Sequence, residues 1–155
     1  MKFLKSFVVL SHILKVFFHI VLLKLTRSVQ NSIFEISVNE GIKFLTRLRL
    51  GLSHLKKYKF LHDFADTVNP MCSCNIEEES LNHYLLHCPN FDQIRIHLMN
   101  ELNKVNPILI HLDDISLCKI LLYGDGSFDN ETNAKIINLT INFIHKSERF
   151  NIPLF

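Results

Sequence analysis

Apolar residues recur every three or four positions along most of the chain, which is the spacing of an amphipathic α-helix. Only 4 Gly and 4 Pro interrupt the 155 residues. Few breakers among many Leu, Ile and Phe favour helices over a turn-rich β-sandwich. The pattern therefore predicts a mainly α fold, a small array of four to six helices with one irregular loop that holds Cys and His residues. A short N-terminal strand over 33–38 is also compatible with the pattern.

Glycine, proline and acidic residues mark the expected boundaries in the first half of this array. Gly51 is expected to end one helix, and a short basic helix is expected over about 52–65. The acids at 77–79 suit the first turn of the following helix, because a helix N-terminus favours negative charge. That helix should end near Cys88, since Pro89 disfavours α geometry in the residue before it, and Pro89 suits the opening of the next helix.

Two further helices are expected towards the C-terminus. Asp113 is predicted to cap a helix that ends at Gly124. Asn130 is predicted to cap a last helix with a buried stripe of Ala134, Ile137, Ile141 and Ile144.

The N-terminal segment is apolar and begins with Lys2 and Lys5, which resembles an export signal or a membrane anchor. Polar residues interrupt its apolar run at Ser11, His12, Lys15 and His19. Its apolar positions also fall at helical spacing, so an amphipathic helix, in a core or at an interface, is favoured and a membrane anchor over residues 1–25 is the alternative. We therefore expect an apolar N-terminal extension over 1–35 and a helical domain over 36–155.

Charge is distributed unevenly, although the net charge is only +2. Residues 41–60 carry no acid and six cations: Lys43, Arg47, Arg49, Lys56, Lys57 and Lys59. Lys43, Arg47 and Arg49 are expected on the outer face of their helix. Such a basic stripe is a candidate phosphate-binding surface, and it is also what an ordinary solvated helix face looks like.

Three of the four cysteines fall within seventeen positions, interleaved with two histidines. One, eight and four residues separate Cys72, Cys74, His83 and Cys88, and His87 is an alternative fourth ligand to Cys88. Thiolate and imidazole are the ligands of structural Zn²⁺, and four protein ligands would close its tetrahedron. The other interpretation is three buried thiols beside two surface histidines. Clustered, reduced thiols favour an intracellular compartment, the nucleus or the cytoplasm, unless the N-terminus directs the chain to a membrane.

Several segments together resemble the reverse-transcriptase zinc-binding region near the C-terminus of non-LTR, LINE-type retrotransposon polyproteins. They are LTRLRLGLSHLKKYKF (45–60), HDFADTVNPMCSC (62–74), and the acidic EEES followed by LNHYLLHCPNF (81–91). The likeness extends over about Leu45 to Phe150 and leaves residues 1–35 outside it. It implies metal ligation by Cys72, Cys74, His83 and Cys88. It also implies sequence-independent, salt-dependent contacts with nucleic acid, for which the candidates are Arg47, Arg49, Lys56, Lys57 and Lys59.

No catalytic constellation is visible in the sequence. Asp113-Asp114 lacks the aromatic residue of a polymerase metal turn, and helix capping explains it better. No four-carboxylate ribonuclease site or phosphate loop is recognisable either. We therefore predict a non-catalytic protein without a small-molecule substrate. The alternatives are an inactive structural relic of a retroelement and a small membrane-associated protein anchored by residues 1–25.

Overall fold

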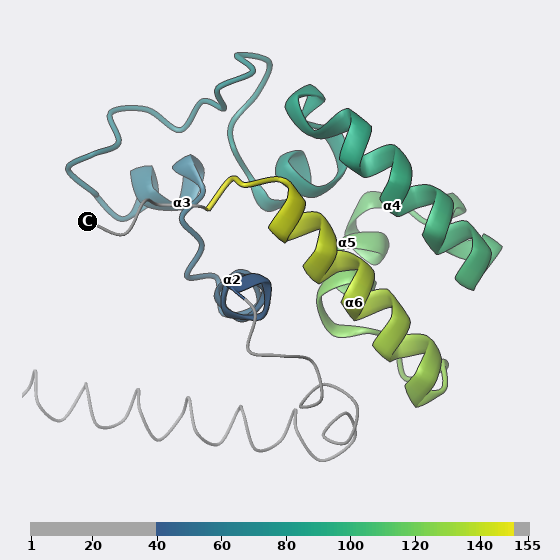
Figure 1. Ribbon diagram of the computed structural model, residues 1–155. Helices are drawn as coiled ribbons and strands as arrows, with labels where there is room; N and C mark the ends of the chain where they lie inside the picture. Colours follow the sequence, from purple (N-terminus) through teal and green to yellow (C-terminus); the bar gives the residue numbers. More distant parts are fainter. Residues whose placement is uncertain (1–39, 151–155) are drawn as a thin grey trace, which may run out of the picture. The chain divides into compact units, whose positions relative to one another are not determined.

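The computed structural model describes residues 40–150 as helices joined by short loops (Figure 1). All of these residues belong to one compact unit, 38–155. Within them there is no strand, only an isolated antiparallel bridge between Met71 and Glu78, so the prediction of a mainly α fold is confirmed. The predicted extension (1–35), strand (33–38) and anchoring segment (1–25) lie outside the described residues. No helix among residues 40–150 is both long and apolar enough to cross a membrane.

Residues 40–150 contain five α-helices and three shorter helical turns. The α-helices are α2 (Glu40–Arg49), α3 (Lys56–Leu61), α4 (Asp92–Val105), α5 (Asp114–Tyr123) and α6 (Asn130–Lys146). The shorter turns are the π-helical η1 (His83–His87) and the 3₁₀ turns η2 (Pro89–Phe91) and η3 (Pro107–His111).

Local sequence signals fix several of these boundaries as expected. Gly51 follows α2 and Gly124 follows α5, with φ angles of 67° and 74° that favour glycine. Asp113 caps α5, since its carboxylate accepts hydrogen bonds from the backbone N–H groups of the first turn. The cap of α6 is Asp129 and not Asn130, because the carboxylate of Asp129 accepts the N–H of Thr132.

Two boundaries differ more from the prediction. The basic helix expected over 52–65 is reduced to α3, because Leu55 is extended and Asp63 adopts a left-handed conformation, with φ of 53°. Residues 77–79 do not enter a helical turn. They complete the loop that begins at Pro70, and the next helical residues start at Leu81. Pro89 does open a helical segment, although its first turn is the 3₁₀ turn η2.

Helix α6 lies at the centre of the packing and contacts α2, α4 and α5. Figure 1 shows α4 and α6 side by side in opposite directions, with α2 seen end-on and therefore crossing them. The predicted stripe on α6 is buried at Ile137, Ile141 and Ile144, while Ala134 is only half-buried. Ile136 and Phe143 are also buried, so α6 presents a wider apolar face than the stripe suggested.

A group of aromatic side chains attaches η1 to this core. The fully buried ring of Tyr84 packs edge-on against Phe91, Phe143 and Phe150, with centroid separations of 5.3, 5.5 and 5.3 Å. Its hydroxyl lies 2.7 Å from that of Ser147, so the buried polar end is satisfied. The short helical segment that carries His83 is therefore held rigidly against the helices.

Candidate metal centre

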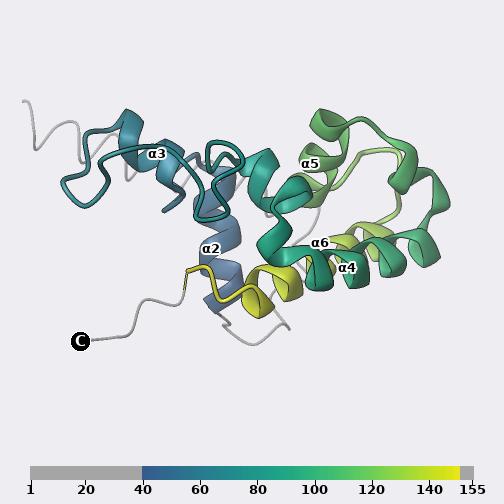
Figure 2. The ribbon, with the colours of Figure 1, turned by 90° about the horizontal axis from the view of Figure 1, so that it is seen from above.

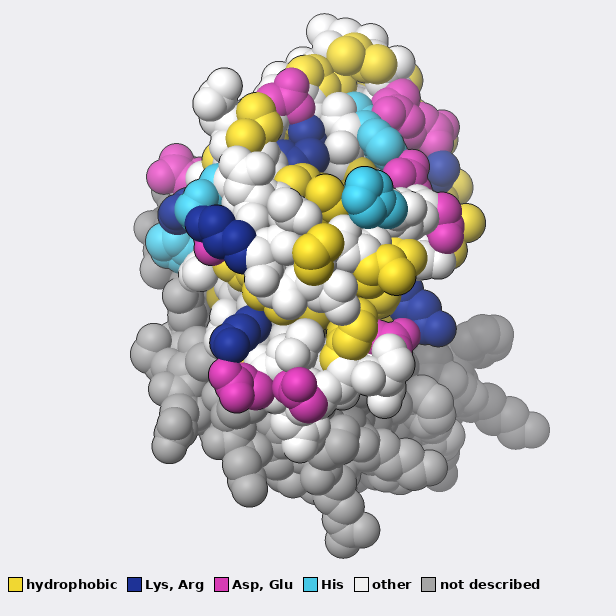
Figure 3. Space-filling view, turned by 90° about the vertical axis from the view of Figure 1, so that its right-hand side faces the viewer, with side chains coloured by type: hydrophobic (Ala, Val, Ile, Leu, Met, Phe, Trp, Pro, Cys, Tyr) yellow, Lys and Arg dark blue, Asp and Glu magenta, His cyan; other side chains and the backbone are white. Residues whose placement is uncertain are grey.

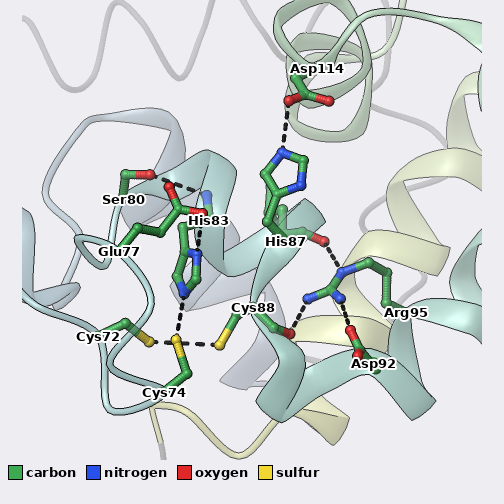
Figure 4. A network of polar contacts seen from close by, with 11 residues as sticks. Cys72, Cys74, Glu77, Ser80, His83, His87, Cys88, Asp92, Arg95 and Asp114 are labelled. Carbon is green, nitrogen blue, oxygen red and sulfur yellow. Dashed lines mark hydrogen bonds and ion pairs between the residues drawn. The ribbon is translucent and has the colours of Figure 1, made fainter.

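The first half of the site is the loop over residues 70–79, whose backbone closes on itself. The N–H of Cys72 donates to the carbonyl of Glu77 (2.9 Å), and the N–H of Asn75 donates to the carbonyl of Cys72 (3.0 Å). Asn75 is in the left-handed region (φ 61°), which asparagine tolerates better than most residues. This tight turn brings Cys72 and Cys74 to the same side of the loop, as Figure 4 shows.

The second half of the site comes from η1 and the residue after it. The turn is π-helical, and the N–H of Cys88 donates to the carbonyl of His83 at 2.7 Å. A hydrogen bond between residues five apart aligns His83 with Cys88, where an α-helix would have aligned it with His87. Cys88 is itself extended, as expected before Pro89, and its side chain turns back towards His83 (Figure 4).

The four predicted ligands come together at one place. Their ligand atoms, three sulfurs and one imidazole nitrogen, all lie within 4.8 Å of one another. The sulfurs of Cys72 and Cys88 are 3.6 Å apart, and the sulfur of Cys74 is 3.2 Å from Nε2 of His83. A zinc tetrahedron with Zn–S bonds of about 2.3 Å separates two sulfurs by about 3.8 Å and a sulfur from a nitrogen by about 3.5 Å. The observed spacing therefore fits a single zinc ion.

Neighbouring groups orient the ligands. Nδ1 of His83 lies 2.8 Å from a carboxylate oxygen of Glu77 and must donate to it, because an ionised carboxylate only accepts. The Nε2 lone pair of His83 then faces the sulfurs, as a metal-bound histidine requires. The buried guanidinium of Arg95 donates to the carbonyl of Cys88 (2.6 Å) and so fixes the backbone of that ligand. The sequence did not single out Glu77 or Arg95, since their partners are set by the fold.

The thiols differ in their electrostatic surroundings. Burial raises the pKa of Cys88 to about 12, and the neighbouring sulfur of Cys72 adds to the rise. Burial also raises the pKa of Cys74, but the polar contacts of its sulfur outweigh burial and lower this pKa to about 7; the largest of them is with the backbone of Ile76, and the side chains of Cys72, His83 and Cys88 contribute. Cys72, His83 and Cys88 are buried while Cys74 is half-exposed, so only one edge of the site faces solvent.

His87 does not join this group. Its side chain is exposed, and its Nε2 pairs with a carboxylate oxygen of Asp114 at 2.7 Å. Cys118, the remaining cysteine, is buried in α5, and burial raises its pKa to about 12. The structure therefore places Cys88, rather than His87, beside the other three candidate ligands.

The basic residues of 41–60 are less uniform than their spacing suggested. Arg49 was predicted on the outer face of its helix, and this prediction is wrong: the guanidinium packs between α2 and α5 and donates to the carbonyl of Leu122. Burial accordingly lowers the pKa of Arg49. Lys57 pairs with Glu78 (2.7 Å), and Lys59 pairs with Asp66 (2.5 Å).

Arg47 and Lys59 lie near a histidine that the sequence did not single out. Nη1 of Arg47 is 2.9 Å from Nε2 of His54, and Nη2 of Arg149 donates to the backbone carbonyl of His54 at 3.4 Å. Burial lowers the pKa of His54, and the charges of Arg47, Lys59 and Arg149 lower it further. Cations from α2, α3 and the chain after α6 therefore converge on one region.

Comparisons with protein-family models, with curated proteins and with solved structures found no match to this chain. The class that fold and site define is a small helical domain with a Cys₃His group able to hold a metal ion such as zinc.

Proposed function

We propose that the chain is a non-catalytic helical module stabilised by one structural zinc ion, which Cys72, Cys74, His83 and Cys88 bind. The observation that carries this proposal is the convergence of four ligand atoms within 4.8 Å, two from the 70–79 loop and two from η1 and the residue after it. The carboxylate of Glu77 binds Nδ1 of His83 and so directs Nε2 towards the thiols, which is the arrangement typical of a metal-bound histidine.

A structural role follows from the number of ligands. Four protein ligands fill the tetrahedron of zinc and leave no position for a water molecule that could attack a substrate. The 70–79 loop has little hydrophobic core of its own, since residues 73 and 75–78 are exposed. The ion would stabilise the loop in place of such a core. It would fix that loop on η1 and, through Tyr84, on the helical core.

Zinc analysis of the purified protein tests this proposal. The full chain, expressed with zinc and purified without chelator, is expected to contain about one zinc ion per molecule by plasma mass spectrometry. Cobalt should replace zinc and give the intense visible absorption of a tetrahedral thiolate site. Protein that is folded yet holds neither metal would contradict the proposal.

We further propose that the module binds nucleic acid without sequence preference, as its resemblance to the terminal region of non-LTR retrotransposon proteins implies. The convergence of Arg47, Lys59 and Arg149 around His54 supports this role. Glu79 engages Arg149 and Asp66 engages Lys59, so the cations of this region that a phosphate backbone would contact are Arg47 and, by replacing the exposed Asp66, Lys59. The face seen in Figure 3, away from α3, instead mixes acidic, basic and hydrophobic side chains. A polymerase-like reading frame directly upstream in the genome is expected if the retroelement origin is right.

Salt dependence is the expected signature of this binding. For two or three phosphate contacts, raising monovalent salt from 50 to 200 mM should weaken binding to a mixed-sequence oligonucleotide roughly 10- to 40-fold. Substituting Arg47→Gln should flatten the slope by about one contact, measured by fluorescence anisotropy. Lys135→Gln, on α6 with its own Glu131 partner, is the matched control and should leave the slope unchanged. A zinc-loaded chain that binds no nucleic acid at any salt concentration would instead identify an inactive relic.

A further inference from the structure

Helix α3 differs from the other α-helices of residues 40–150, because none of its six residues is buried. Three rings lie together on α3 and just after it: Tyr58, which is half-buried, and His62 and Phe64, which are exposed and follow the helix. We call them the α3 aromatic group. The ring of Tyr58 lies 4.2 Å from that of His62 and 6.2 Å from that of Phe64, with tilts of 44° and 57°. Phe64 is 42% exposed, and His62 is exposed as well.

The position of α3 makes this exposure informative. In Figures 1 and 2 the helix lies beside the 70–79 loop, away from the packed α4 and α6. Its first turn is held in place by Glu79, whose carboxylate accepts the backbone N–H of Lys56 at 2.7 Å. Rings presented on a fixed helix lose little freedom on binding a partner, so they suit recognition of a planar group.

Cations accompany the rings. Lys56, Lys57 and Lys59 flank Tyr58 on α3, and α2 contributes Arg47 beside His54. Three acids are nearby: Asp66 is paired with Lys59, Glu78 is paired with Lys57, and the exposed Asp63 lies between His62 and Phe64 in the sequence. Both side chains of the Lys57–Glu78 pair are exposed, so that pair contributes little and a phosphate can take the place of Glu78. In the other pair Lys59 is half-buried, and its exposed partner Asp66 is the group that a phosphate would replace.

We propose that the α3 aromatic group stacks against the bases of single-stranded nucleic acid while the adjacent lysines contact its phosphates. This inference rests on the proposed nucleic-acid role and names the form of the ligand. Alternating cations and exposed rings are the means by which proteins hold single strands without reading sequence, because every base offers a flat face. Bases in a duplex are already stacked on one another, so the rings would add nothing to duplex binding. The rings of the α3 aromatic group are tilted and not stacked face to face, so part of their surface is free to stack on a base.

The test compares two substitutions at Tyr58 in the full, zinc-loaded chain. Tyr58→Leu removes the ring, whereas Tyr58→Phe keeps it. Binding is measured by anisotropy with a labelled mixed-sequence DNA strand and with the duplex of the same sequence. We expect the wild-type chain to prefer the single strand, and Tyr58→Leu to weaken single-strand binding about tenfold while Tyr58→Phe changes it less than twofold. Because the charges remain, the salt slope should be the same in all three proteins.

Two more variants guard against an effect on folding. Phe64→Leu alters an exposed ring of the same group and is expected to weaken single-strand binding in the same direction. Tyr123→Leu alters an exposed tyrosine on α5, outside the group, and should leave binding unchanged. Since the chain has no Trp, quenching of tyrosine fluorescence by the single strand should be largely lost in Tyr58→Leu.

The outcomes separate this inference from the proposed function. Equal binding of strand and duplex, unaffected by Tyr58→Leu and Phe64→Leu, would overturn the stacking proposal and leave charge-based binding standing. Failure to bind either form would overturn both. Binding of neutral lipid vesicles in place of nucleic acid would show that the rings serve a membrane surface, and would also overturn the proposal.

Discussion

Replacing Cys88 with serine will abolish stoichiometric zinc binding and lower the stability of the fold by about 4 kcal/mol, when free zinc exceeds its dissociation constant about a thousandfold. The reason is that metal bound only by the folded chain adds its binding free energy to folding. The effect should be visible as a lower urea midpoint. Addition of a chelator should bring the wild-type protein down to the variant's midpoint and leave the variant unaffected.

The chain offers two matched controls for this substitution. Cys118→Ala removes a buried cysteine that is not near the site, and His87→Ala removes the alternative ligand, which pairs with Asp114. Both variants should retain about one zinc ion per chain and remain sensitive to the chelator. If His87→Ala loses the metal and Cys88→Ser keeps it, the assignment of the fourth ligand is wrong.

Replacing Glu79 with glutamine will destabilise the fold by about 3 kcal/mol, because it breaks a buried ion pair and leaves one charge uncompensated. Only 2% of Glu79 is exposed, and its two carboxylate oxygens lie 2.5 Å from Nε and Nη2 of Arg149. This hydrogen bonding raises the pKa of Arg149. When Glu79 is replaced that effect is lost, but a guanidinium stays protonated at neutral pH without a partner, so its charge remains and is unpaired. The measurement is the free energy of unfolding in urea.

A double-mutant cycle isolates the pair. Glu79→Gln combined with Arg149→Met should cost less than the sum of the two single substitutions, because the double variant has no unpaired charge. Glu101→Gln is the control: its exposed pair with Lys104 should cost less than about 1 kcal/mol. A cost for Glu79→Gln as small as that of Glu101→Gln would show that the buried pair does not tie the loop to the C-terminal segment.

The sequence was sufficient to find the group of ligands but not the backbone that assembles it. Spacing alone indicated Cys72, Cys74, His83 and Cys88, and the structure brings these four together. It could not decide between Cys88 and His87, since a regular α-helix would put His83 and His87 on one face. The π turn aligns His83 with Cys88 instead, and no residue preference in the sequence distinguishes a π turn from an α turn.

The three consecutive glutamates show why tertiary partners escaped prediction. Local rules place such acids in the first turn of a helix. In the structure they diverge: Glu77 orients His83, Glu78 pairs with Lys57, and Glu79 pairs with Arg149, seventy residues away. Only packing could reveal the last of these contacts, and the same holds for the burial of Arg49 against α5.

The stretches that resemble retrotransposon proteins coincide with the functional features proposed here. Residues 45–60 contribute most of α3 and two of the three cations around His54, Arg47 and Lys59, and 62–91 contribute all four candidate ligands. Because no family model, curated protein or solved structure matches the chain, this ancestry remains a prediction from sequence. Zinc binding does not depend on it, since the geometry of the four ligands supports the site independently.

X-ray absorption at the zinc edge of the zinc-loaded chain shows directly which atoms bind the metal. We expect three sulfur neighbours at about 2.3 Å and one nitrogen neighbour at about 2.0 Å. Two sulfur and two nitrogen neighbours would instead indicate that His87, and not Cys88, is the fourth ligand. A shell of oxygen and nitrogen alone would show that the metal lies elsewhere and that these thiols do not hold it.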